Sequence, residues 1–210
     1  MKTLISYGTV TTLCASISLL STNVTAADEA ALYDLAPADA AFIRIINIDT
    51  DSAITASVSD KSVTSEGYCQ ASNYEYISAG TYELTIDEKN WKGDFKEAKT
   101  YTFVISKTAL SVIEDDLFKN PKKGQFAAYN LTDKQTISVK TKDGKKSIFK
   151  EVTENQHVSR EVNPIKIGLS IYEAEIMLLE ADTAKFQRGK SKNLFVCGKE
   201  NNYVTTWAMY

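Results

Sequence analysis

The sequence contains a single histidine, His157, which is the first residue to test for catalysis. In a serine hydrolase or acyltransferase, an imidazole takes the proton of a nucleophilic hydroxyl while a carboxylate orients the ring. The chain has no Gly-x-Ser-x-Gly motif, and Glu154 stands where an Asp-x-x-His motif would have its aspartate. We interpret His157, in the polar stretch "TENQHVSR", as a solvated loop residue. Catalysis by His157 with a serine such as Ser159 is kept as the alternative.

Metal and phosphate chemistry has no better support. One histidine and two distant cysteines cannot complete a tetrahedral zinc site. The stretch "DTDS" (49–52) resembles the start of a calcium loop but lacks the glycine and the distal glutamate. No glycine-rich phosphate cradle is present. We therefore expect no metal, no cofactor and no enzymatic activity.

The sequence does contain side chains that are suited to binding a ligand. Trp91 lies in the polar stretch "DEKNWKGDF", which is expected to be a loop, and its indole is a candidate for stacking on a sugar. Trp207 lies in an alternating stretch and is expected in the core. Arg44 stands among apolar residues, so its guanidinium must reach an edge or meet a carboxylate.

A second arginine precedes a proline in the stretch "REVNPIKIGLSIYE" (160–173). Proline fixes its own φ and biases the residue before it toward extended geometry, so Asn163-Pro164 would set how the following strand begins. Arg160 would then stand at the rim of the fold, where it could hold a carboxylate of a partner or of a uronate polymer, or form a pair within the chain. Our candidates for binding a partner or a glycan are Arg44, Trp91, Lys119, Arg160, Asn163, Lys166 and Arg188.

Charge is unevenly distributed along the chain. Residues 27–116 contain 7 Lys and Arg against 17 Asp and Glu, whereas residues 117–210 contain 16 against 10. The basic half is suited to an acidic partner or polymer, although the two halves could also simply attract each other. Nucleic acid is not an expected partner, because the chain is expected to be exported and its pI is near 5.3.

The N-terminus resembles a secretory signal peptide. Lys2 precedes a short apolar stretch that ends at Val24-Thr25-Ala26, a small-residue cleavage signal. We predict cleavage after Ala26, a periplasmic mature chain and no transmembrane segment within it. Cys69 and Cys197 remain, and an oxidising compartment would permit one disulfide between them, with two free buried thiols as the alternative.

Strand patterns dominate the mature chain. Apolar and polar residues alternate in "TYELTI" (81–86), "TYTFVIS" (100–106) and "QTISVK" (135–140), and Asp143-Gly144 suits a tight hairpin turn. Helical periodicity is hard to find, and "AEIMLLEAD" (174–182) fits a short strand as easily as a helix. Many short strands between turns predict an all-β protein built from immunoglobulin-like sandwiches.

The chain also repeats itself. The stretch "RIINIDTDSAITASV" (44–58) aligns without a gap on "AAYNLTDKQTISVKT" (127–141), which places Asn47 on Asn130. Two tandem modules are therefore predicted, at residues 27–113 and 125–210. Residues 114–124 would form the linker between them.

The ordered motifs resemble those of the AlgF family of periplasmic alginate O-acetylation proteins. The resemblance rests on "ALYDLAPADAAFIRIIN" (31–47), "FKNPKKGQFAAYNLTD" (118–133), "REVNPIKIGLSIY" (160–172) and "FQRGKSKNLFV" (186–196). The chain departs from the family pattern in its two cysteines, in "NWKGDFKEA" (90–98) and in its last residues.

The resemblance implies a non-catalytic accessory protein of exopolysaccharide O-acetylation. Its implied partners are the membrane and periplasmic components of the acetyltransferase machinery and, as a second ligand, an anionic polysaccharide. Alginate is the first choice of polymer, and another acetylated exopolysaccharide is the second. An acetyltransferase or esterase using His157, and an immunoglobulin-like adhesin or pilus chaperone, are the alternative functions.

Overall fold

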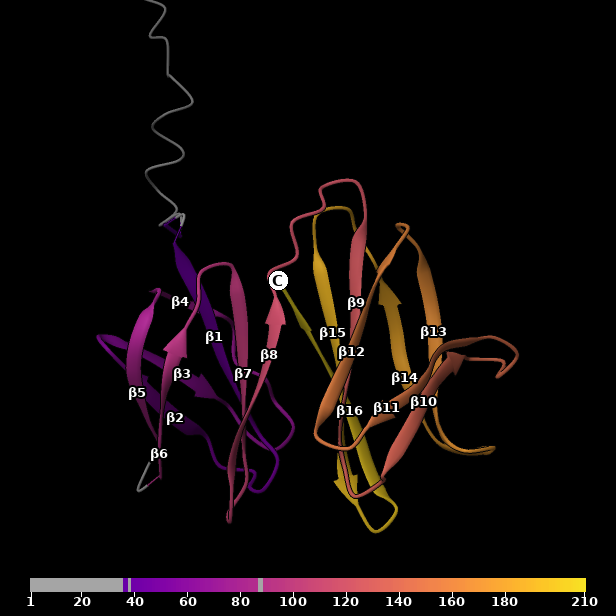
Figure 1. Ribbon diagram of the computed structural model, residues 1–210. Coiled ribbons are helices and arrows are strands. Elements are labelled where there is room, and N and C mark those ends of the chain that lie inside the picture. Colours follow the sequence, from indigo (N-terminus) through magenta and orange to yellow (C-terminus); the bar gives the residue numbers. More distant parts are fainter. Residues whose placement is uncertain (1–35, 38, 87–88) are drawn as a thin grey trace, which may run out of the picture. The chain divides into compact units, whose positions relative to one another are not determined.

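The computed structural model describes residues 36–37, 39–86 and 89–210, which form sixteen β-strands and no helix (Figure 1). The predicted signal peptide, residues 1–26, lies outside the described residues. Within the described part of the chain, no helix could cross a membrane. Residues 36–210 form one compact unit.

The first module contains eight strands in two four-stranded sheets, ordered β4-β1-β7-β8 and β3-β2-β5-β6. The strands are β1 (Ala40–Asn47), β2 (Ile54–Val58), β3 (Lys61–Ser65), β4 (Glu75–Ser78), β5 (Gly80–Ile86), β6 (Lys89–Phe95), β7 (Lys99–Ile105) and β8 (Leu110–Asp116).

The second module repeats this arrangement with sheets ordered β12-β9-β15-β16 and β11-β10-β13-β14. Its strands are β9 (Gly124–Thr132), β10 (Thr136–Thr141), β11 (Ser147–Thr153), β12 (Gln156–Val162), β13 (Lys166–Glu173), β14 (Ile176–Lys185), β15 (Ser191–Lys199) and β16 (Asn202–Met209). Each strand of the second module thus corresponds to the strand of the first module whose number is eight lower, for example β9 to β1. In both modules the first and seventh strands pair in parallel.

Each module is a sandwich around its own apolar core. Ile43, Ile45 and Phe103 from one sheet pack with Leu84 and Ile86 from the other in the first module. In the second module the core residues again come from both sheets, among them Phe126, Leu194, Val139, Leu169 and Ile171. The all-β sandwich prediction is confirmed, and residues 176–182 of the ambiguous stretch are strand.

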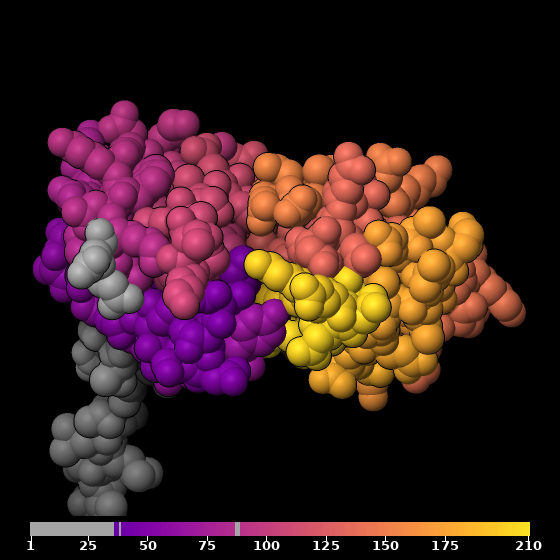
Figure 2. Space-filling view, turned by 90° about the horizontal axis from the view of Figure 1, so that it is seen from below, coloured from indigo at the N-terminus to yellow at the C-terminus, as the bar shows by residue number. Residues whose placement is uncertain are grey.

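A third apolar cluster joins the two modules. It contains Ile46, Val104 and Ile113 from the first module and Tyr129 and Phe195 from the second. Strands β1 and β9 are therefore covered on both faces, one by their own module and one by the other. In Figure 2 the yellow C-terminal residues lie against indigo residues of the first module. The ring centroids of Phe42 and Tyr210 are 5.3 Å apart.

A disulfide also crosses this junction. Cys69, between β3 and β4, is bonded to Cys197 in β15, and their Cα atoms are 6.0 Å apart. Both cysteines belong to the junction cluster and are almost fully buried. The stretch that joins the modules outside any strand is residues 117–123.

Candidate functional site

The structure corrects the prediction that His157 is a solvated loop residue. It lies in β12, opposite Tyr129 of β9, and its side chain is only 15% exposed. The imidazole stacks on the Tyr129 ring at 5.0 Å, and its Nε2 lies 2.8 Å from Oδ2 of Asp115 on β8. The histidine thus connects the second module to a carboxylate of the first.

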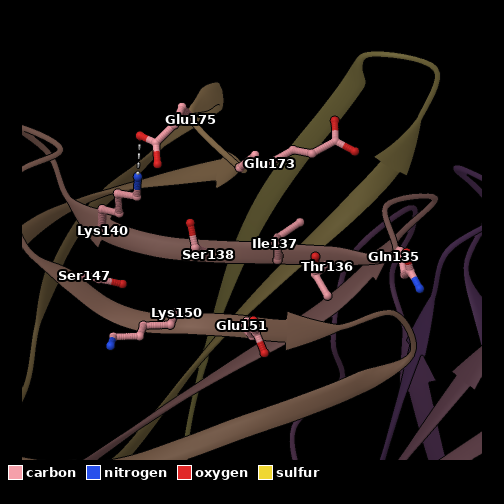
Figure 3. A pocket seen from close by; sticks show the side chains of 11 residues that line it. Gln135, Thr136, Ile137, Ser138, Lys140, Ser147, Lys150, Glu151, Glu173 and Glu175 are labelled. Carbon is pink, nitrogen blue, oxygen red and sulfur yellow. Dashed lines mark hydrogen bonds and ion pairs between the residues drawn. The ribbon is translucent and has the colours of Figure 1, made fainter.

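No described serine hydroxyl forms a hydrogen bond with His157, so the Asp115–His157 pair has no third member. Another buried serine hydroxyl, that of Ser138, lies elsewhere in the second module. Ser138 lies in a hollow of about 430 Å³ on the outer face of the β11-β10-β13-β14 sheet, and its Oγ is buried without a hydrogen-bond partner (Figure 3). The hollow has lysine and glutamate side chains but no histidine, and Lys140 there pairs with Glu175 at 3.4 Å. We see no arrangement that would activate Ser138.

Arg44 is fully buried at the junction between the modules. Its Nε donates to Oγ1 of Thr102 at 2.9 Å, and its Nη2 donates to the hydroxyl of Tyr129 at 3.0 Å. The guanidinium also lies over the rings of Tyr74 and Phe195, at 4.4 and 4.7 Å. No carboxylate of the described residues pairs with it, and Nη1 has no hydrogen-bond partner.

The aromatic surroundings of Arg44 are strongly desolvated. Burial raises the pKa of the Tyr129 hydroxyl well above its usual range, while the nearby guanidinium opposes this shift. Tyr129 therefore remains a neutral hydrogen-bond partner of Arg44 at physiological pH. Because Arg44 lies inside the molecule, we leave it out of the surface proposed below.

Trp91 is also less exposed than its polar neighbours suggested. It lies in β6 rather than in a loop, opposite Leu84 of β5. Its indole is half-buried against the first core, with ring centroids 5.3 Å from Phe95 and 5.1 Å from Phe103. The ring also covers Gly93, where an added methyl group would meet it at less than 3 Å. The side chain therefore works mainly in packing.

The other five binding candidates are brought together at one end of the second module. Three segments meet there: the connector 117–123, residues 163–165 after β12, and residues 186–190 after β14. Lys123 Nζ donates to Oδ1 of Asn163 at 2.6 Å, and the amide of Gly189 donates to the carbonyl of Lys123 at 2.7 Å. At the same end, Lys166 is the strand partner of Lys185.

We call this surface the basic end, defined by Lys119, Lys122, Lys123, Arg160, Lys166, Lys185, Arg188 and Lys190. All eight side chains are exposed except that of Lys123, which is half-buried. Three carboxylates flank these segments in sequence, those of Asp115 and Asp116 at the end of β8 and that of Glu161 in β12. Each has a partner, because Asp115 pairs with His157, Asp116 pairs with Lys99, and Asn120 donates to Glu161 at 2.8 Å. Within the described residues, none of these eight cations forms an ion pair. Their charge is therefore available to an external anion.

A family comparison assigns the chain. Residues 14–193 match the family model described as "Alginate O-acetyl transferase AlgF". The chain belongs to the AlgF family. Among its AlgF relatives is "Alginate biosynthesis protein AlgF" of Pseudomonas putida, which is 31% identical over 209 residues, or 99% of this chain and 96% of the relative. The protein of the same name from Azotobacter vinelandii is 30% identical over 188 residues, or 89% of this chain and 86% of the relative.

A solved structure of the C-terminal domain of AlgF from P. aeruginosa is also similar to this chain. It is 26% identical, with a TM-score of 0.39, and the match covers 42% of this chain and 99% of that domain.

Sequence reasoning missed the junction and its polar residues. Thr102, Asp115 and Tyr129 gave no signal of their own as functional or structural partners. A signal was nevertheless present in "AAFIRIIN" (40–47) and "FAAYNLT" (126–132), which are apolar runs rather than alternating patterns. Such runs are typical of strands that are buried on both faces.

Proposed function

We propose that this AlgF-family protein is a non-catalytic accessory protein of alginate O-acetylation in the periplasm. It would act by binding components of the acetyltransferase machinery, with the basic end as its main contact surface. The names of the family and of the relatives support the pathway. The division of labour between this chain and its partners is our own inference.

The observation that carries the non-catalytic role is the position of His157. A general base needs a free nitrogen within hydrogen-bond reach of the hydroxyl that it deprotonates. Here Nε2 faces Asp115 and one ring face is stacked on Tyr129, so only Nδ1 could act as a base, and no described serine hydroxyl forms a hydrogen bond with it. A carboxylate and an aromatic ring hold the imidazole as part of the junction between the modules.

The basic end supports the binding role. Five of its cations lie in the loops 117–123 and 186–190, and three lie on the strands β12, β13 and β14. A backbone hydrogen bond from Gly189 to Lys123 joins the two loops, and Lys123 also donates to Asn163, so the cations present a fixed pattern of charge. Exposed charges of one sign steer oppositely charged partners and accelerate their association. A protein with an acidic surface, or the carboxylates of alginate itself, would meet this requirement.

Catalysis by this chain is the second candidate, because the matching family description contains the word transferase. It predicts that His157 takes part in acetyl transfer. The accessory role predicts that His157 matters only for the packing of the junction.

The two candidates are separated in a strain from which the gene has been deleted. The accessory role predicts that this strain still makes polymer but without acetyl groups, and that wild-type protein restores them. His157→Gln, which keeps a polar side chain at the junction, should restore acetylation equally well, alone or combined with Ser159→Ala. An unacetylated polymer from cells holding normal amounts of the folded His157→Gln protein would refute the accessory role.

A further inference from the structure

A groove of about 440 Å³ opens beside the basic end of the second module. Its lining includes residues of β11 and β12, the edge strands of the two sheets of this module, and of the start of β13, together with residues of the neighbouring strands and loops. It therefore lies where the two sheets of the sandwich part. This groove plays no role in the packing of the two modules.

The floor of the groove is an aliphatic row that leads from the core to the surface. Leu169 is fully buried, Ile167 is half-buried, and Ile165 is 50% exposed. Ile167 and Leu169 are two apart in β13 and therefore share one face, and Ile165, just before the strand, lines the same groove. The carbonyl of Ile165 accepts a hydrogen bond from the amide of Phe186 at 2.8 Å, which fixes the backbone beneath the exposed side chain.

The rim of the groove is basic. Lys123, Lys146 and Arg160 line it, and within the described residues none of them forms an ion pair. Among the described residues, the Arg160 side chain forms one hydrogen bond, from Nη1 to the carbonyl of Ile148, at a long 3.4 Å. Glu161, the acidic residue of the lining, already accepts a hydrogen bond from Asn120. A ligand would therefore meet an apolar floor between positive charges.

This combination is better suited to a protein segment than to a sugar chain. Protein interfaces have an apolar centre within a polar rim. A uronate polymer carries carboxylates but little apolar surface to place on an aliphatic floor. The lining contains neither tryptophan nor tyrosine, and its two phenylalanines, Phe126 and Phe186, are 1% and 3% exposed, so no flat ring is presented to a sugar.

We propose that this groove binds an acidic segment of a partner protein that carries an apolar side chain between carboxylates. The apolar side chain would cover Ile165, and its acidic neighbours would reach Arg160 and Lys146. The inference rests on the proposed accessory function and names the contact through which it would act. Alginate bound in the groove is the competing outcome.

The first arm of the test uses the purified mature chain and the fluorescein-labelled peptide Glu-Asp-Leu-Glu-Leu-Asp-Glu as probe. We expect fluorescence anisotropy to show binding that weakens with added salt, as an interaction between charges requires. Ile165→Asp and Arg160→Glu should each weaken binding by about tenfold. Ile165→Ser, which removes the aliphatic side chain without adding charge, separates loss of the apolar contact from repulsion.

Matched controls are available within the chain. Ile176→Asp replaces another exposed isoleucine of the same module, and Lys107→Glu reverses an exposed cation of the first module. Both should bind the probe as wild type does. A peptide with serine in place of leucine, and an oligomannuronate of equal charge, should bind about tenfold more weakly. Equal binding by the oligomannuronate, equal binding by the Ile165 variants, or no binding of the probe would overturn the proposal.

The second arm measures polymer acetylation in the deletion strain carrying the same variants. Ile165→Asp combined with Arg160→Glu should bring acetylation down toward that of the deletion strain, whereas Ile176→Asp with Lys107→Glu should restore it. Full acetylation with the groove variant would refute the groove as the binding site for a partner and leave the accessory function intact. Normal acetylation in the deletion strain itself would instead refute the accessory function.

Discussion

Arg44 places a positive charge between the two modules without a carboxylate to pair with it. It is held by two hydroxyl acceptors, Thr102 and Tyr129, and by the faces of aromatic rings. Burying a charge is costly, and such contacts offset only part of the cost. The arginine is therefore better explained by a role in fixing how the modules meet than by a contribution to stability.

Two substitutions of Arg44 should separate packing from charge. Arg44→Met keeps an unbranched side chain of similar length and removes the buried charge, so we expect the free energy of unfolding to stay within about 1 kcal/mol of wild type or to rise. Arg44→Ala leaves a cavity and should lower it by about 3 kcal/mol. Urea denaturation measures both values. A loss for methionine as large as that for alanine would mean that the charge itself stabilises the junction.

The surroundings of a single residue could be predicted from the sequence only where its neighbours in sequence determine them. The position of Asn163-Pro164 just before a strand could be predicted, because proline restricts the backbone of its own residue and of the one before it. His157 and Arg44 could not be placed, because part of the surroundings of each residue comes from the other module. Trp91 was misplaced because polar neighbours hid a strand in which alternate side chains face the core.

Two asparagines at equivalent positions show how the strands are held at their ends. Asn47 and Asn130 end the apolar part of β1 and β9, and both are fully buried. The Asn47 amide donates to the carbonyls of Thr50 and Ser52, and its Oδ1 accepts from the amide of Asp49. The Asn130 amide donates to the carbonyl of Lys134 in the turn and to that of Val152 in β11, and its Oδ1 accepts from the amide of Thr132, as that of Asn47 accepts from Asp49.

Asn47→Ala and Asn130→Ala should therefore have similar effects. Each leaves buried backbone groups without partners, and we expect each to lower the free energy of unfolding by about 2–3 kcal/mol. Thermal and urea unfolding of the two variants provide the measurement. A large loss for one and none for the other would contradict the equivalence of the two turns.

The positions of the strands and turns were the features that the sequence predicted best. Alternating stretches became strands, the Asp143-Gly144 turn formed with Gly144 at φ 71°, and the aligned asparagines took matching roles. The pairing of β1 with β7 and of β9 with β15 could not be predicted, because these strands are distant in sequence. The apolar runs of β1 and β9 did hold information on burial, but not on which surface covers the second face.

At the scale of the whole molecule, the junction makes the two modules one unit. An apolar cluster, the Asp115–His157 pair and the Cys69–Cys197 bond all cross it. The two cysteines are separated by 128 positions, so the bond closes a long loop in the unfolded chain. Restricting such a loop is the main route by which a disulfide stabilises a protein.

Removal of the disulfide should weaken the fold without abolishing it. Cys69→Ala with Cys197→Ala is expected to lower the free energy of unfolding by about 2–5 kcal/mol, while each module keeps its own core. Reductant should lower the stability of the wild-type protein by a similar amount and leave the double variant unchanged. Urea unfolding that is identical in oxidised and reduced wild-type protein would contradict this role.

The central claim is that the chain supports acetylation through contacts at the basic end of its second module. The most direct test is the acetyl content of polymer from a deletion strain that produces Lys119→Glu, Lys166→Glu and Arg188→Glu together. The matched control is Lys92→Glu, Lys107→Glu and Lys199→Glu, which changes the net charge equally at exposed positions elsewhere. We predict that the first variant, present in normal amounts, yields poorly acetylated polymer and that the control restores wild-type acetylation. Equal acetylation by the two variants would contradict the claim.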